Sequence, residues 1–273
     1  MSVVEKGRTL NVRGKLLPLD TPLVMGILNV TPDSFYAASR QQTEDEVARR
    51  ADQIVAEGAD IIDVGGCSTR PGATCASESE ERERLRMALD VVGRRHPGAV
   101  VSVDTFRPEL ARMAVEEYGV SMVNDVSEGS DAMYAMVARL KVPYVLTSVR
   151  STLLEMLPVL ADEVARLRAL GVNDIIVDPG FGFGKTLEQN YALLSQLHLL
   201  HALDLPLLVG VSRKSMLWRL LGTTPDDTLS ATTALHAVAL MKGASVLRVH
   251  DVAAAVQVCK VMGQLTDSCQ CCS

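Results

Sequence analysis

One unit recurs along the 273-residue chain and constrains its fold more than any other feature. It consists of a glycine, a short spacer, an apolar run and a polar residue, as in EGADIIDVGG at 57–66, YGVSMVNDVSEG at 118–129, LGVNDIIVDPG at 170–180 and KGASVLRVHD at 242–251. Glycine is favoured where a helix ends at positive φ, and a short apolar run indicates a buried strand. Four glycines are therefore predicted to end a helix and to lead into a strand: Gly58, Gly119, Gly171 and Gly243.

Helices are predicted between these strands. Two patterns, Thr43 with Glu46 and Ser77 with Glu80, match the capping box of a helix N-terminus, and apolar residues at helical spacing follow each of them. Four further apolar runs bring the candidate strands to eight: 23–30, 100–104, 144–148 and 207–212.

Eight strands, each followed by a helical stretch, predict an α/β fold of the (β/α)₈ TIM barrel type with a single domain. The alternative is an open, doubly wound sheet, which would place a glycine fingerprint after its first strand, where this chain has NVTPDSF at 29–35. We expect the barrel to span residues 23–265. The segment RTLNVRGKLLPLD lies within the preceding residues 1–22 and is predicted to form a short hairpin that caps the barrel bottom. Residues 266–273 are predicted to be a flexible tail that contains cysteines.

The composition narrows the class of protein further. A hydrophobic share of 48% with only 4% aromatics suits strands that are buried on both faces. The net charge of -6 argues against a nucleic-acid or anionic-membrane partner, because either would require a basic surface. No apolar run approaches the length of a membrane span, residues 1–10 lack a secretory pattern, and the cysteines do not form a zinc or disulfide framework. We therefore expect a cytoplasmic protein.

Polar residues gather at the predicted strand ends, where barrels of this type hold their active sites. Buried charges are costly unless they are paired, so a whole ring of them indicates a ligand. Carboxylates and amides can accept hydrogen bonds from the ring N–H and exocyclic amine of a flat, nitrogen-rich heterocycle. Four residues offer this chemistry: Asp104, Asn124, Asp178 and Lys214.

A second group follows the first and last strands, which are neighbours in a closed barrel. Asn29, Arg248 and His250 supply an oxygen ligand and cationic donors, a combination that suits phosphate or pyrophosphate with Mg²⁺. The segment PGFGFGKT at 179–186 is not a phosphate-binding P-loop, because only three residues separate Gly180 from Gly184 and that loop requires four. We expect Lys185 to support its loop or to lie on the surface.

Seven motifs in order resemble the dihydropteroate synthase family, the folate-pathway enzymes that sulfonamides inhibit. They extend over nearly the whole chain: NVTPDSF (29–35), DVGGCSTRPGA (63–73), SVDTFRP (102–108), VNDVS (123–127), VDPGFGFGK (177–185), GVSRKSML (210–217) and RVHDV (248–252). The resemblance implies a transferase that condenses 6-hydroxymethyl-7,8-dihydropterin pyrophosphate with p-aminobenzoate, giving 7,8-dihydropteroate and pyrophosphate.

The resemblance also implies roles for individual residues. The pterin would be held by Asp104, Asn124, Asp178 and Lys214. Pyrophosphate would be bound by Asn29, Asp63, Arg248 and His250, with Asn29 as the Mg²⁺ ligand. The p-aminobenzoate pocket would be shaped by Thr69, Arg70, Pro71, Phe183 and Ser215, together with Lys214. The residues expected to act in catalysis are Asp104, Lys214, Arg248 and His250. The expected partners are these small-molecule substrates and a second copy of the chain, with a dimer face on the last two helices.

Two segments depart from the family pattern. Relatives carry a Met-His-Met stretch and a long loop at the fifth strand, whereas this chain has YVLTSVRSTLLEML at 144–157, where Val145 to Ser148 are expected to contact the pterin. The first loop contains YAASR in place of a Ser-Asp-Gly-Gly type sequence. We expect the loops after strands one and two to order over the site when pyrophosphate and Mg²⁺ bind. The alternatives are a pterin-dependent methyltransferase and a non-catalytic pterin-binding paralogue.

Overall fold

The computed structural model describes residues 7–30, 40–67 and 76–270, with the side chains of 40–42 and 266–270 left aside. Its main sheet has eight strands in the spatial order β8-β7-β6-β5-β4-β3-β10-β9, and every pair of neighbours is parallel. Their bounds are β3 (Leu23–Asn29), β4 (Ile61–Gly65), β5 (Val100–Asp104), β6 (Met122–Asp125), β7 (Tyr144–Thr147), β8 (Ile175–Asp178), β9 (Leu208–Val209) and β10 (Val246–Val249).

The two ends of this sheet meet. A parallel bridge joins Val177 in β8 to Leu207, the residue before β9, and the Val177 N–H donates to the Pro206 carbonyl at 2.9 Å. The strands therefore run around a nearly closed ring in chain order from β3 to β10, and the predicted (β/α)₈ barrel is confirmed. A doubly wound sheet would have left two strand edges apart.

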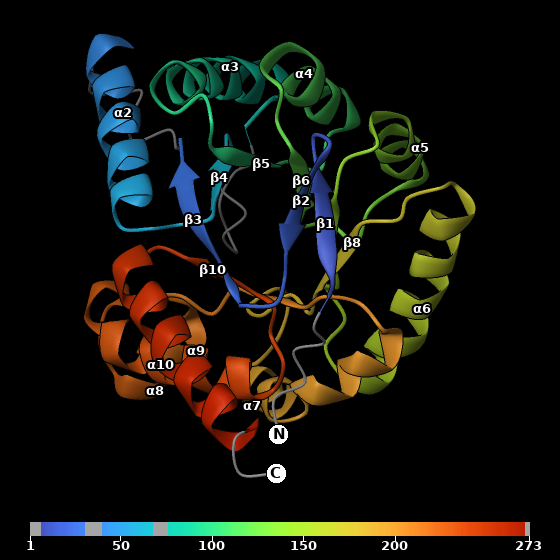
Figure 1. The fold of residues 1–273 in the computed structure, drawn as a ribbon, viewed down its shortest axis with the longest axis vertical. Coiled ribbons are helices and arrows are strands. Elements are labelled where there is room, and N and C mark those ends of the chain that lie inside the picture. Colours follow the sequence, from blue (N-terminus) through green and yellow to red (C-terminus); the bar gives the residue numbers. More distant parts are fainter. Residues whose placement is uncertain (1–6, 31–39, 68–75, 271–273) are drawn as a thin grey trace.

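Helices form an outer ring around the strands (Figure 1). Their bounds are α2 (Arg40–Ala56), α3 (Glu78–Arg95), α4 (Pro108–Tyr118), α5 (Asp131–Leu140), α6 (Leu153–Ala169), α7 (Leu187–Ser195), α8 (Ser215–Leu221), α9 (Leu229–Met241) and α10 (Val252–Gln270), with short 3₁₀ helices η1 (Leu197–Leu203) and η2 (Pro225–Thr228). The four glycines predicted to end helices all have φ between +67° and +90°. That prediction is confirmed at each position.

Of the two predicted capping boxes, one is confirmed and the other is wrong. Ser77 accepts from the Glu80 N–H and Glu80 bonds back to the Ser77 N–H, so this capping box is confirmed at the start of α3. The box predicted at Thr43 is wrong, because α2 begins at Arg40 and Thr43 is buried within the helix. A Thr-x-x-Glu pattern inside a helix has the same letters as one at its start. Two further boxes cap α6 and α7, from Thr152 and Thr186.

A two-stranded antiparallel hairpin, β1 (Thr9–Val12) and β2 (Lys15–Pro18), lies across the middle of the ring of strands (Figure 1). Leu10 and Leu17 of the hairpin and the following Leu19 join the apolar cluster inside the barrel. Burial of these side chains removes apolar surface from water and closes the bottom of the barrel. The predicted N-terminal hairpin is therefore confirmed.

The last helix, α10, continues to Gln270, so the predicted start of a flexible tail at residue 266 falls inside it. Helix α10 packs against α9 and against β3. Residues 271–273 lie outside the described part of the chain. Among the described residues, none of the helices combines the length and the apolar character that crossing a membrane requires.

Candidate active site

The barrel interior has two layers with opposite chemistry. Its lower layer is apolar and is built by Leu23, Met25, Ile61, Met122, Val145, Ile176, Leu208 and Val246. Side chains two residues apart on a strand share a face, so the next interior position on each strand lies one layer higher, toward the carboxyl ends. That upper layer is polar and contains Asp63, Ser102, Asp104, Asn124, Thr147, Asp178 and Arg248. On six of the eight strands, β4, β5, β6, β7, β8 and β10, the interior side chains thus change from apolar to polar over two residues, whereas β3 has Ile27 at the corresponding position.

Arg248 in β10 connects the acidic residues of this layer. Its Nε donates to Asp63 Oδ2 at 2.6 Å, and its Nη2 donates to Asp104 Oδ2, also at 2.6 Å. Asn124 Nδ2 donates to the same Asp63 oxygen at 3.0 Å. Asp63 is fully buried and Asp104 is 5% exposed, so the guanidinium partly compensates two carboxylates that have lost their water.

This withdrawal from water changes the protonation chemistry of the layer. Burial raises the pKa of Asp104 to about 7, and Asp63 adds to the rise while Arg248 opposes it. Burial alone would lower the pKa of Arg248, but Asp63 and Asp104 outweigh it and hold that pKa above its usual range. Strongly shifted groups that share a cavity are typical of functional sites.

Asp178 and Lys214 form the other side of the layer. Burial raises the pKa of Asp178, although Lys214 opposes the rise, and burial lowers the pKa of Lys214 to about 8, although Asp178 opposes the fall. Asp178 Oδ1 accepts from the Gly180 N–H at 2.8 Å, while Lys214 Nζ donates to the Phe181 carbonyl. The opposite charges of Asp178 and Lys214 therefore attract each other, while each side chain is oriented by a hydrogen bond to a backbone group.

Four buried polar atoms of the upper layer have no hydrogen-bond partner within the part of the chain that the structure describes. They are Asp63 Oδ1, Ser102 Oγ, Asn124 Oδ1 and Thr147 Oγ1. Native proteins rarely leave buried polar atoms unsatisfied, and those that remain so require an explanation. Three carboxylates, an amide and two hydroxyls around one space suit a ligand with several N–H donors.

Comparison with known proteins identifies the family. Residues 25–250 match the sequence model of the family described as Pterin binding enzyme. Dihydropteroate synthase of Escherichia coli (strain K12) is 36% identical over 266 residues, covering 92% of this chain and 94% of that protein. The same enzyme of Synechocystis sp. is 40% identical over 267 residues, with 89% of each chain covered. This chain belongs to the dihydropteroate synthase family.

Solved structures of dihydropteroate synthases have the same fold. The Xanthomonas albilineans enzyme with 4-aminobenzoic acid has a TM-score of 0.88 and 37% identity, covering 94% of this chain and 98% of its own. The Coxiella burnetii enzyme in complex with pteroic acid has a TM-score of 0.83 and 34% identity, covering 93% and 97%. The family resemblance predicted from seven sequence motifs is confirmed, and the chain is a transferase enzyme of this family.

The second predicted group, at the ends of β3 and β10, lies at the same mouth of the barrel. Asn29 is exposed at the end of β3, beside Gly65 of β4. His250 follows β10, and its Nδ1 lies 3.2 Å from Ser212 Oγ. Arg50 of α2 joins these strands, because it donates to the Ile27 carbonyl at 3.2 Å and to the His250 carbonyl at 2.6 Å. No pattern in the sequence indicates this last contact, because Arg50 is one of several arginines in α2.

The residues predicted for the p-aminobenzoate side are only partly described. Thr69, Arg70 and Pro71 lie outside the described residues, as does most of the loop after β3. Phe183 is half-buried in the turn after β8, and Lys214 Nζ lies 5.0 Å from the centre of its ring. Ser215 is the first residue of α8 and directly follows Lys214. The described part of this group therefore gathers around Lys214.

Three polar residues near the carboxyl ends of strands bond away from the polar layer. Asp125 accepts from the Tyr144 hydroxyl at 2.8 Å, Ser148 donates to Glu128, and Arg213 pairs with Asp251. Their neighbours Asn124 and Thr147 face the site, because successive residues of a strand alternate between its faces. Lys214 lies beyond β9, at the N-cap of α8, and its ammonium points to the Phe181 carbonyl. Ser102 was missed, although it lies two residues before Asp104 on one strand, and that spacing is the signal that could have found it.

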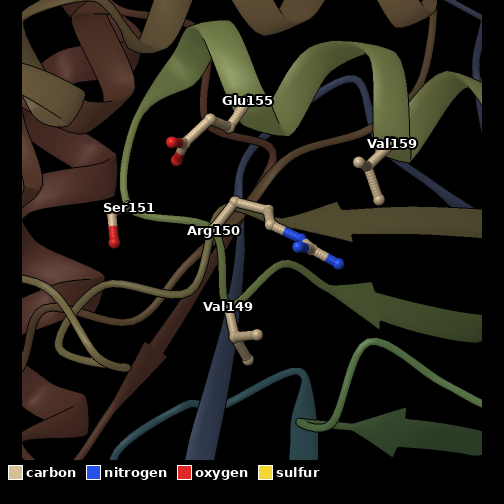
Figure 2. Close-up of a pocket in the computed structure, with 5 residues that line it drawn as sticks. All are labelled: Val149, Arg150, Ser151, Glu155 and Val159. Atoms are coloured by element: carbon tan, nitrogen blue, oxygen red, sulfur yellow. The ribbon is translucent and has the colours of Figure 1, made fainter.

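The recomposed segment after β7 forms a short connection to α6. It borders a pocket of about 530 Å³ that is lined by Val149, Arg150, Ser151, Glu155 and Val159 (Figure 2). None of these five belongs to the polar layer, so this pocket lies beside the site. Glu128, after β6, holds the segment through its Oε1, which accepts from the Val149 N–H at 3.1 Å and from Arg150 Nε at 3.0 Å.

Proposed function

We propose that this enzyme condenses 6-hydroxymethyl-7,8-dihydropterin pyrophosphate with p-aminobenzoate to 7,8-dihydropteroate, with release of pyrophosphate, in folate biosynthesis. The observation that carries the proposal is the polar layer, in which four buried polar atoms have no hydrogen-bond partner among the described residues. Family membership supports it, as do the relatives that were solved with 4-aminobenzoic acid and with pteroic acid.

The polar layer suits the pterin. A pterin presents an amidine-like edge of ring and exocyclic N–H groups, and a buried carboxylate can accept two such bonds at once. Asp178 at one side, with Asn124 and Asp104 at the other, supplies these acceptors, and Lys214 supplies a donor for a ring nitrogen or carbonyl. Asn124 Oδ1, which lacks a hydrogen-bond partner among the described residues, would then gain one from the ligand, and this would offset the free-energy cost of its burial.

The chemistry needs electrostatic help more than a nucleophile. The methylene C–O bond breaks and its electron pair leaves with pyrophosphate, so positive charge develops on the pterin methylene in an SN1-like path. The p-aminobenzoate amine then forms the C–N bond with its lone pair and loses a proton to water. Asp104, when ionised, stabilises the cation, while Arg248 and His250 offset the charge of the leaving group. Asp63 orients Arg248 through the 2.6 Å contact.

We further propose that Mg²⁺ accompanies the pyrophosphate. Among the described residues, no group of three or more His, Cys, Asp or Glu side chains is placed to hold a metal ion. This fits Mg²⁺, which is commonly held by one or two protein oxygens, substrate phosphates and water. Asn29 at the end of β3 would be the protein ligand. When bound, the ion would neutralise charge on the leaving pyrophosphate.

For the second substrate, Phe183, Lys214 and Ser215 would form one side of the p-aminobenzoate pocket, with Thr69, Arg70 and Pro71 on the other. The cation of Lys214 over the Phe183 ring supports this arrangement, because it brings a positive charge and an aromatic wall together for a benzoate. The closing of the first two loops over the bound substrates stays a prediction, since most of both loops lies outside the described residues.

We also propose a cytoplasmic homodimer. Large apolar side chains are exposed on the last three helices, at Leu220 and Leu221 of α8, Leu229 and Met241 of α9, and Val261 and Leu265 of α10. Exposed apolar patches of this kind are typical of protein interfaces. Sedimentation velocity on the purified chain tests the dimer, and a single species with the mass of one chain would contradict it.

The test of the activity is an incubation of the purified chain with dihydropterin pyrophosphate, p-aminobenzoate and Mg²⁺. Dihydropteroate, detected by mass, should form together with pyrophosphate, and EDTA should abolish both products. Pterin binding without any product would support the non-catalytic paralogue. Methyl transfer to a corrinoid acceptor, without condensation, would support the pterin-dependent methyltransferase.

A further inference from the structure

Lys185 ends the glycine-rich turn after β8, and its ammonium is enclosed by backbone carbonyls. Nζ donates to the Gly180 carbonyl at 2.8 Å and lies 3.4 Å from the carbonyls of Ser148 and Phe183. Two of these oxygens belong to the turn itself, and the third belongs to the end of β7. One side chain therefore ties two neighbouring loops at the barrel mouth.

The turn approaches the β7 end so closely that only glycine fits. A Cβ on Gly180 would lie 2.0 Å from the Ser148 carbonyl oxygen, and Gly180 has φ +68°. Close approach turns several carbonyl dipoles toward one point, where their oxygens repel one another unless a cation lies between them. Burial lowers the pKa of Lys185 to about 8, although Asp178 and Glu128 oppose the fall, so the ammonium gives up water to occupy this position.

The β7 end is also tied to β8 by the Ser148 N–H, which donates to the Asp178 carbonyl at 2.8 Å. On its outer side lies the pocket of Figure 2, to which the loop contributes Val149, Arg150 and Ser151 while Glu155 and Val159 project from α6. The loop is held by hydrogen bonds to Glu128 on one side and to Lys185 on the other.

The turn that Lys185 holds is the one that carries Phe183. The Phe183 N–H donates to the Gly180 carbonyl at 3.2 Å, so Lys185 and Phe183 share one acceptor. The Gly182 N–H is held separately by Asn190 Oδ1 at 2.8 Å. From this position the Phe183 ring faces Lys214. Movement of the clamped carbonyls would therefore move the ring.

We propose that Lys185 is a positioning residue, which clamps the turn after β8 to the end of β7 and thereby sets the Phe183 wall against which p-aminobenzoate binds. The role in p-aminobenzoate binding rests on the proposed condensation, whereas the contact between the two loops does not depend on it. Lys185 resembles a P-loop lysine in sequence, but its ammonium binds backbone carbonyls. The proposal gives this lysine a function.

The kinetic test compares Lys185→Met and Lys185→Arg with the matched control Lys15→Met, an exposed lysine of β2 at the barrel bottom. In Lys185→Met the KM for p-aminobenzoate should rise about tenfold, the equivalent of one lost charge-assisted hydrogen bond, while the KM for the pterin substrate and kcat change by less than about threefold. Lys185→Arg keeps a cation that can donate to several carbonyls and should restore most of the loss. Lys15→Met should match the unmodified chain.

Two kinetic outcomes would overturn the proposal. The first is an unchanged KM for p-aminobenzoate in Lys185→Met. The second is a parallel loss for both substrates that Lys185→Arg does not rescue, because that result indicates general damage to the fold.

Amide hydrogen exchange supplies a test that does not depend on turnover. The Phe183 amide should exchange about tenfold faster in Lys185→Met, as one protecting hydrogen bond weakens, with α2 and α3 unchanged. Unchanged exchange at Phe183 would overturn the clamp in an active enzyme. If the unmodified chain made no dihydropteroate, the proposed function and the p-aminobenzoate role would both fail, while faster exchange would still show the clamp.

Discussion

The lower and upper layers of the barrel interior are made by the same strands, yet they differ in what they do for the molecule. Ile61 and Asp63 are two residues apart in β4, and both are fully buried. Burying Ile61 in the lower layer is favourable by about 2 kcal/mol. Asp63 in the upper layer loses its hydration, and its hydrogen bonds to Arg248 and Asn124 compensate only part of that free-energy cost. The lower layer therefore stabilises the barrel, and the upper layer is preorganised for a ligand.

The largest expected effect that would sharpen this contrast is on turnover. Arg248→Ala removes the donor to Asp63 and Asp104, and kcat should fall roughly 100- to 1,000-fold, because a group that offsets charge in the transition state is lost. Circular dichroism should still show a folded barrel. Steady-state kinetics beside the surface control Arg139→Ala measures the loss, and turnover near that of the unmodified chain would remove Arg248 from its assigned role.

The matching change in the lower layer should act on stability. Ile61→Ala leaves a cavity among the apolar residues above the hairpin, and the free energy of unfolding should fall by roughly 2–5 kcal/mol. At 25 °C the folded fraction should keep kcat within about threefold of its original value, because the chemistry lies at the other end of the strands. Urea unfolding together with an activity assay checks both parts, and a large loss of kcat in fully folded protein would break the division between the layers.

The upper layer should also make stability depend on pH. Because burial raises the pKa of Asp104 to about 7, the folded state binds a proton more tightly than the unfolded state does, so this group's contribution is full below pH 4 and is lost as pH rises to about 7. Asp178, whose pKa is also raised, acts in the same direction. Unfolding measured from pH 4 to 8 should show a shallower decline for Asp104→Asn, and identical slopes would contradict the shift.

The smallest effect is expected on the outer face of the hairpin. Leu16 in β2 is 69% exposed, whereas Leu10 in β1 is buried in the lower layer. Leu16→Ala should change the free energy of unfolding by less than about 0.5 kcal/mol, since it fills no cavity. Thermal unfolding beside Leu10→Ala separates the two faces, and an equal loss from both would mean that the hairpin is stabilised by something other than its inward side chains.

The fold could be predicted well from the sequence because the signals for helix ends and buried strands are local. A glycine that ends a helix and an apolar run that follows it each depend on a few residues, and Gly58, Gly119, Gly171 and Gly243 all have the predicted backbone. The capping box predicted at Thr43 was wrong because this signal is also local. The Thr-x-x-Glu pattern does not show that the helix already begins at Arg40.

The site was predicted less completely, because it depends on which strand face is inward and on contacts between distant residues. Within the predicted pterin contact Val145 to Ser148, Thr147 belongs to the polar layer, whereas the Ser148 hydroxyl donates to Glu128. The pairing of Arg248 with Asp63 and Asp104 joins positions 185 and 144 residues apart, and no spacing in the sequence indicates it. The sequence motifs predicted which residues form the site, and the structure shows which of the described ones contact one another.

The single bridge between Val177 and Leu207, beside a β9 of only two residues, makes the barrel a ring with a narrow seam. Asp178 lies on one side of that seam and Lys214 follows the strand on the other. A ligand that binds both side chains would act as a cross-link over the shortest ladder in the ring. Ligand binding would then raise the free energy of local unfolding at the contact between β8 and β9. Without ligand, this contact would be the first part of the barrel to unfold locally.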